Sequence, residues 1–233
     1  MPTRAPSVDG VDIRVEAGQR VGVIGESGSG KTQTAFSVLG LLPRGGHVSG
    51  GRIDFDGSDL TAASEKQYTA LRGTRIGYIP QEPMSNLDPS FTIGSQLVEP
   101  LRVGLGMSKK DATERALSLL DRVGIPNPQR TFDAYPFEVS GGMAQRVLIA
   151  GAVSTDPDLI IADEPTTALD VTVQAEVLDL LRDLQKERGM AMLLVTHNFG
   201  VVADLCDRVT VMQQGLFVES GPVRTISVPM MCV

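Results

Sequence analysis

The residues best suited to chemistry lie in one glycine-rich stretch, residues 25–32, which reads GESGSGKT. It fits G-x-x-x-x-G-K-[ST], a pattern whose glycines let the backbone wrap closely around phosphate oxygens. Lys31 is then expected to reach the β- and γ-phosphates of a nucleotide, and the Thr32 hydroxyl to hold Mg²⁺. The alternative is a Gly/Ser-rich surface turn. The residues expected to bind phosphate are Gly25, Glu26, Ser27, Gly28, Ser29, Gly30, Lys31 and Thr32.

Two adjacent carboxylates form a second candidate group. The apolar run LIIA at residues 159–162 is followed directly by Asp163 and Glu164. A buried strand that ends in two acids delivers them to the carboxyl edge of an open α/β sheet, where ligands bind. We expect Asp163 to contact Mg²⁺, directly or through water, and Glu164 to polarise an attacking water. The alternative is a solvated strand end.

A third candidate group is Ser140 with Gly141 and Gly142. Ser140 is a good N-cap, and two glycines at a helix start leave backbone N–H groups open to an anion. Taken alone, this stretch is more simply interpreted as a capped helix.

These groups need alternating strands and helices to hold them. The apolar spacing predicts strands at residues 8–17, 20–24, 51–55, 75–79, 159–162, 191–195, 208–212 and 217–219. It predicts helices at residues 32–39, 60–71, 93–123 with a break near 104–106, 140–153, 171–188 and 199–205, and loops at 80–89 and 125–135. This order predicts an α/β fold of the P-loop NTPase type. We expect a mostly parallel sheet core, an N-terminal antiparallel β part and an inserted helical subdomain at about residues 90–155.

Composition excludes several classes of protein. The 233 residues carry a net charge of −7, so the chain lacks the surplus of Lys and Arg that non-specific nucleic-acid binding needs. Cys206 and Cys232 are too few for a disulfide framework or a zinc site, and Cys206 is expected to be buried. The first residues lack an apolar signal core, and no apolar run approaches a membrane span. We therefore expect a cytoplasmic chain that meets a membrane only through a partner.

The three groups, in this order along the chain, resemble the nucleotide-binding domain of ABC transporters. The family's other motifs are matched by Gln81 in the Q-loop, by Asp170 in the D-loop Ala168-Leu169-Asp170, and by the switch residue His197. The resemblance covers roughly residues 8–225. It implies a single ATPase domain over residues 1–225, followed by a short, truncated C-terminal tail at 226–233.

Within that family the sequence is most similar to ATPase subunits of dipeptide and oligopeptide importers. The stretches that carry this likeness are residues 25–34, 80–89, 135–147 and 196–203.

The resemblance implies ATP and Mg²⁺ as ligands and a head-to-tail dimer with a second ATPase subunit, identical or different. Each ATP would lie between the P-loop of one chain and residues 140–142 of the other. Glu164, His197 and Gln81 would act in hydrolysis, with His197 on the γ-phosphate and Gln81 sensing Mg²⁺ and water. Asp170 would couple the two sites.

The same resemblance implies membrane permease subunits as partners, contacted through residues 81–89 and the helical block. An extracytoplasmic solute-binding protein would act indirectly, and no nucleic acid is expected. The expected location is the cytoplasm, peripheral on the inner face of the cell membrane.

Two features depart from the family pattern. Residues 1–20 contain no aromatic residue to stack on adenine, and Asn198 stands where an aspartate is usual after the histidine, with a mild effect expected. Two alternatives stay open: a truncated, poorly active nucleotide-binding module, or a non-transport ABC ATPase. The second class usually carries coiled-coil insertions, zinc-binding cysteines or a tandem second domain, and none is present in this sequence.

Overall fold

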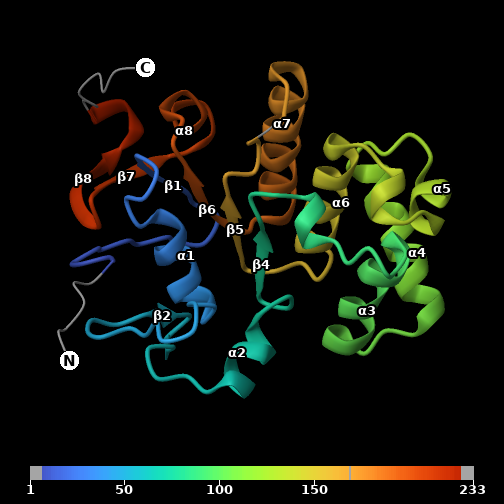
Figure 1. Cartoon of the computed structure of the whole chain (residues 1–233), viewed down its shortest axis with the longest axis horizontal. Coiled ribbons are helices and arrows are strands. Elements are labelled where there is room, and N and C mark those ends of the chain that lie inside the picture. Colours follow the sequence, from blue (N-terminus) through green and yellow to red (C-terminus); the bar gives the residue numbers. More distant parts are fainter. Residues whose placement is uncertain (1–6, 168, 227–233) are drawn as a thin grey trace.

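A six-stranded sheet forms the centre of the molecule (Figure 1). The computed structural model describes residues 7–167 and 169–226, so Ala168, Cys232 and nearly all of the expected tail lie outside it. The strand order is β4-β5-β6-β1-β7-β8; all neighbours pair in parallel except β7 and β8, which are antiparallel. The strands are β1 Arg20–Gly25, β4 Ile76–Ile79, β5 Leu159–Asp163, β6 Ala191–Thr196, β7 Arg208–Gln213 and β8 Leu216–Pro222.

Helices cover both faces of the sheet. Side chains alternate along β6, so that Met192 and Leu194 join one hydrophobic cluster while Leu193 and Val195 join the other. A strand buried on both faces reads as a nearly unbroken apolar run, as β5 and β6 do. Helix α1, Lys31–Leu39, packs on the second face, whereas the first face is covered by α6 Gly141–Val153, α7 Val171–Arg188 and α8 Phe199–Leu205.

A block of helices follows β4 and leads into β5, at the right of Figure 1. It contains α3 Ile93–Leu105, α4 Lys109–Arg122, α5 Pro128–Asp133 and α6. The block occupies the stretch where the sequence predicts an inserted helical subdomain. No helix among the described residues is long and apolar enough to cross a membrane.

The predicted strand at residues 8–17 is wrong. Val11, Ile13 and Val15 do pack on the sheet, and the residues between them are exposed, which accounts for the alternating pattern. The backbone, however, makes only an isolated bridge from Asp9 to Leu216. Alternation reports which side chains are buried, but a strand also needs a neighbouring strand for its backbone. The antiparallel β part is therefore smaller than expected: β2 Asp54–Phe55 and β3 Ser58–Asp59 form a short hairpin.

The predicted loop at residues 125–135 is also wrong, because it contains α5. Asn127 caps this helix through a bond from the Arg130 N–H to its side chain, and Pro128 occupies the first turn. Two smaller differences remain. The helix predicted at 60–71 is confined to α2, Glu65–Leu71, and a short 3₁₀ helix, Met84–Asn86, lies within the expected loop at 80–89.

The end of α1 is fixed by a close contact with α2. Gly40 ends the helix in the left-handed conformation at φ 63°, which favours glycine. A Cβ at this position would lie 2.6 Å from the ring of Tyr68, whose hydroxyl donates to the Leu60 carbonyl oxygen at 2.9 Å. The ring is held in place, so it has little room to move away from an added methyl group.

Gly40→Ala should therefore lower the free energy of unfolding by about 3 kcal/mol, from the left-handed backbone and the clash together. Gly45→Ala is the matched control, since φ is 85° there and no described atom lies within 4 Å of a Cβ. The control substitution should lower the free energy of unfolding by about 1 kcal/mol. Urea denaturation measures both values, and equal losses would contradict the role given to Tyr68.

Candidate functional site

The glycine loop joins β1 to α1 at the carboxyl edge of the sheet. Gly28 and Gly30 have φ values of 79° and 97°, where L-residues with side chains are strained. A Cβ on Gly25 would lie 2.2 Å from the carbonyl oxygen of Met212. The Ser29 hydroxyl is buried and has no hydrogen-bond partner among the described residues. The loop thus has the close backbone and the spare donor that a phosphate cradle requires.

Lys31 places its ammonium group inside this loop. Its Nζ donates to the carbonyl oxygens of Gly25 at 2.8 Å and Glu26 at 2.9 Å, and the residue is only 6% exposed. Burial lowers the pKa of Lys31, while the carboxylates of Glu164 and Asp163 act in the opposite direction. A positive charge is therefore held at the loop, close to both acids.

Asp163 and Thr32 bring two oxygen ligands together. The Thr32 hydroxyl donates to Asp163 Oδ1 at 3.3 Å, and Asp163 is 1% exposed at the end of β5. Burial raises the pKa of Asp163, and the Thr32 hydrogen bond partly offsets the rise. Burial also raises the pKa of Tyr78, and the nearby Asp163 adds to this rise. A buried carboxylate beside a hydroxyl is a ligand set that suits a hard divalent cation such as Mg²⁺.

Glu164 turns the chain directly after β5. Its φ is 49°, and its N–H donates to the carbonyl oxygen of Val195 on β6 at 2.8 Å. Its carboxylate has a partner on each oxygen: His197 Nδ1 lies 2.8 Å from Oε1, and the Thr167 hydroxyl donates to Oε2 at 3.0 Å. The His197 side chain is 63% exposed, whereas that of Glu164 is 10% exposed. The acid is thus fixed from inside the protein and the imidazole faces outward.

Gln81 lies near this group but is not bonded to it. It follows β4, whose last residue Ile79 pairs with Ala162, so Gln81 and Asp163 share the carboxyl edge of the sheet. Gln81 is exposed, and its side chain makes no hydrogen bond among the described residues.

The remaining predicted site residues lie at helix starts. Ser140 is the N-cap of α6, as predicted, and accepts from the Met143 N–H at 3.3 Å. Gly141 and Gly142 form the first turn of that helix. Asp170 caps α7 through a 3.0 Å bond from the Val173 N–H. Because α6 and α1 pack on opposite faces of the sheet, residues 140–142 do not meet the P-loop of their own chain (Figure 1).

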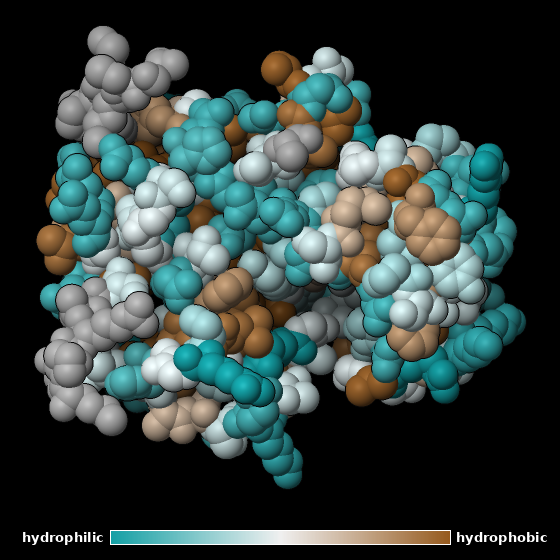
Figure 2. All heavy atoms as spheres, in the orientation of Figure 1, coloured by the Kyte–Doolittle hydropathy of each residue, from teal (hydrophilic) through white to brown (hydrophobic). Residues whose placement is uncertain are grey.

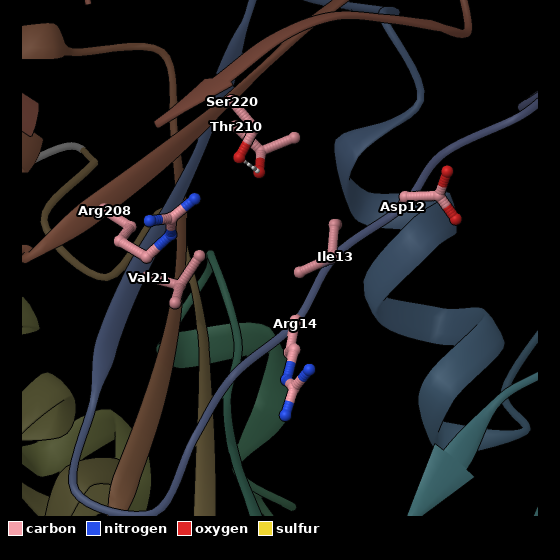
Figure 3. Close-up of a pocket in the computed structure, with 7 residues that line it drawn as sticks. All are labelled: Asp12, Ile13, Arg14, Val21, Arg208, Thr210 and Ser220. Atoms are coloured by element: carbon pink, nitrogen blue, oxygen red, sulfur yellow. Dashed lines mark hydrogen bonds between the residues drawn. The ribbon is translucent and has the colours of Figure 1, made fainter. Parts of the chain in front are cut away.

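A separate cavity of about 310 Å³ lies away from this site (Figure 3). Figure 3 shows Val21 and Arg208 on one side, from the amino-terminal parts of β1 and β7, and residues 12–14 on the other. The P-loop lies at the opposite end of β1. The cavity is therefore not the candidate site.

Sequence reasoning missed two residues of the site, Thr167 and Tyr78. Thr167 lies three residues after Glu164 in a turn that contains Pro165, and this spacing is the only signal for its contact. Tyr78 lies on β4, and its proximity to Asp163 depends on the pairing of β4 with β5. That pairing cannot be read from the local sequence.

Asn198 connects the histidine to α8. Its side-chain oxygen accepts from the N–H groups of Gly200 at 2.9 Å and Val201 at 3.4 Å. Asparagine and aspartate are equally good N-caps, so the departure from aspartate at this position leaves the cap intact.

Comparison with known proteins gives a consistent result. The family model described as ABC transporter matches residues 8–167. A Brucella melitensis protein, provisionally named a peptide import ATP-binding protein, is 52% identical over 226 residues, covering 94% of this chain and 67% of its own length. The dipeptide transport ATP-binding protein DppD of Escherichia coli K12 is 44% identical over 225 residues, and the match covers 97% of this chain and 68% of the length of DppD.

A solved structure adds a match in fold. It is a dimeric ATP-binding cassette in a post-hydrolysis state, bound to ADP and Pi. It superimposes on this chain with a TM-score of 0.83 at 27% identity, covering 94% of this chain and 92% of its own.

The cap on α8 can be tested by stability measurements. Asn198→Ala should lower the free energy of unfolding by about 1 kcal/mol, because the N–H groups of Gly200 and Val201 lose their acceptor. Asn198→Asp should stay within about 0.5 kcal/mol of the parent, since aspartate also accepts these bonds. Chemical denaturation followed by circular dichroism measures both. An aspartate variant as unstable as the alanine variant would contradict the cap.

Proposed function

The chain belongs to the ABC transporter family, and on that premise we propose that it hydrolyses ATP in a head-to-tail dimer to drive import of peptides or similar small solutes. The observation that carries this proposal is the assembly of Lys31, Thr32, Asp163, Glu164 and His197 at one edge of the sheet. The names of its relatives, peptide import and dipeptide transport proteins, support the direction and the class of solute.

Hydrolysis of ATP depends on charge neutralisation and an aligned water more than on covalent chemistry. The Lys31 ammonium and the N–H groups of the P-loop would bind the phosphates. Thr32 and Asp163 would hold Mg²⁺, which supplies further positive charge to the phosphate oxygens. Glu164 would accept a hydrogen bond from the attacking water, and His197 would contact the γ-phosphate. Gln81, exposed at the same edge, would reach the metal and the water once nucleotide is bound.

The site needs a second chain to be complete. Residues 140–142 lie at the start of α6, which packs on the face of the sheet opposite α1, and the Ser140 cap takes the Met143 N–H but leaves those of Gly141 and Gly142 available. Such a helix start binds anions. We therefore assign it to the γ-phosphate held by the partner chain, and Asp170 to the coupling of the two sites.

The helical block carries the apolar surface that a membrane subunit would contact. Tyr135 and Phe137 are exposed between α5 and α6, and their rings stack with centroids 5.6 Å apart and planes at 9°. Met84 and Phe91 are exposed in the segment that leads into the block. Figure 2 shows brown and tan side chains among the polar ones on this block. We assign this surface and residues 81–89 to the permease subunits, which would hold the chain on the inner face of the membrane. A solute-binding protein would act only through the permease.

If two chains form each site, the rate of ATP hydrolysis should depend on protein concentration. ATP turnover per chain, measured with Mg²⁺, should rise with the concentration of the purified chain, because two chains build each site. The rate should reach a plateau once dimers predominate. A rate per chain that stays constant over a hundredfold range, with the chain monomeric by light scattering, would exclude the shared site.

Glu164→Gln should separate binding from hydrolysis. The amide keeps the shape of the side chain but is a far weaker acceptor for the water's proton, so turnover should fall on the order of 100-fold or more. ATP should still bind and should stabilise the dimer, which gel filtration detects. Glu219→Gln, an exposed change on β8, is the matched control and should leave turnover unchanged. Parent-like hydrolysis by Glu164→Gln would show that the role given to Glu164 is wrong.

A further inference from the structure

Thr167 is linked to Glu164 by two hydrogen bonds. Its hydroxyl donates to Glu164 Oε2 at 3.0 Å, and its backbone N–H donates to the Glu164 carbonyl oxygen at 3.1 Å. Together they close a short turn over residues 164–167, directly after β5. The hydroxyl is half-buried in this turn, and no function described above uses it.

The two oxygens of the Glu164 carboxylate are held differently. His197 reaches Oε1, but its side chain is 63% exposed and belongs to a different loop. The terminal torsion of a glutamate is broad, so the torsion alone does not fix the plane of the carboxylate. A hydroxyl that donates to Oε2 from within the same turn does fix it. Each oxygen has a second lone pair, so both bonds leave the carboxylate able to accept from a water.

The backbone of the turn is independent of the Thr167 hydroxyl. Glu164 has a positive φ of 49°, a conformation that persists only where the surrounding structure enforces it. Two backbone bonds enforce it here: one from the Glu164 N–H to Val195, and one from the Thr167 N–H to the Glu164 carbonyl oxygen. Loss of the hydroxyl would therefore release the carboxylate while the turn persists.

We propose that Thr167 is a positioning residue for hydrolysis: its hydroxyl orients the Glu164 carboxylate so that the remaining acceptor sites face the attacking water. The inference rests on the proposed role of Glu164. Thr167 touches neither nucleotide nor water in this scheme, and its effect on the reaction passes entirely through Glu164.

The test removes the hydroxyl and keeps the shape of the side chain. Thr167→Val should lower kcat on the order of 10-fold or more, since small misplacements of a catalytic group have effects of this size. The KM for ATP should change less than twofold, and ATP should still drive dimerisation. Thr167→Ser restores the donor and should return kcat to within about threefold of the parent, as one regained hydrogen bond predicts. Thermal unfolding verifies that each variant is folded, and Thr167→Ala replaces the valine variant if that one is not.

Two control variants distinguish a positioning role of Thr167 from a general structural disturbance of the turn. Thr166→Ala removes the adjacent threonine side chain, whose hydroxyl makes no bond to Glu164 among the described residues, and it should keep parent turnover. In the Glu164→Gln background, Thr167→Val should cause no further loss in single-turnover phosphate release, because the residue through which it acts has already been changed.

The outcomes distinguish failure of the positioning role of Thr167 from failure of the proposed function. Parent-like kcat in Thr167→Val, a serine variant as slow as the valine variant, a Thr166→Ala variant equally slow, or an additive loss in the double variant would each overturn the positioning role. Parent-like turnover in Glu164→Gln alone would overturn the proposed function instead, and the inference with it.

Discussion

The site depends on the burial of opposite charges at the end of one parallel strand. Asp163 is almost wholly buried and Lys31 nearly so, and a buried charge is costly unless it is paired or hydrogen-bonded. Burial lowers the pKa of Lys31 and raises that of Asp163, and the charge of each residue partly offsets the shift of the other. The cluster keeps both the carboxylate and the ammonium group close to where phosphate and cation would bind.

The parallel sheet explains how residues so far apart in sequence reach this cluster. β1 pairs with β6, and β6 with β5, so the carboxyl ends of all three strands meet at one edge. The P-loop follows β1, Glu164 follows β5, and His197 follows β6. Each strand contributes one chemical group at the point where its backbone leaves the sheet. Helices on both faces shield these strands from water. The positions of the chemical groups at the strand ends are therefore set by the packed core and not by the loops.

Sequence patterns predicted the parts of this arrangement that are local. The apolar runs that became β5 and β6, and the cap Ser140, depend on neighbours within a few residues. The failures concern information that the local pattern lacks. The alternation of Val11, Ile13 and Val15 correctly indicates burial but cannot show that no strand lies alongside. At α5 the cap Asn127 and the following Pro128 were present in the sequence, yet a helix of six residues is too short for an apolar period to appear.

The contact of Thr167 with Glu164 shows a different limit. A threonine three residues after a glutamate is unremarkable in sequence, and here its hydroxyl meets the carboxylate in a turn where the glutamate has a left-handed backbone. That backbone depends in turn on a bond to Val195, which belongs to a strand about thirty residues away. The same dependence on distant pairing separates α1 from α6: the order of strands places them on opposite faces, so one chain cannot close residues 140–142 over its own P-loop. The topology that assembles the acids with the lysine therefore also fits the proposed dimer, in which a second chain would complete each nucleotide site.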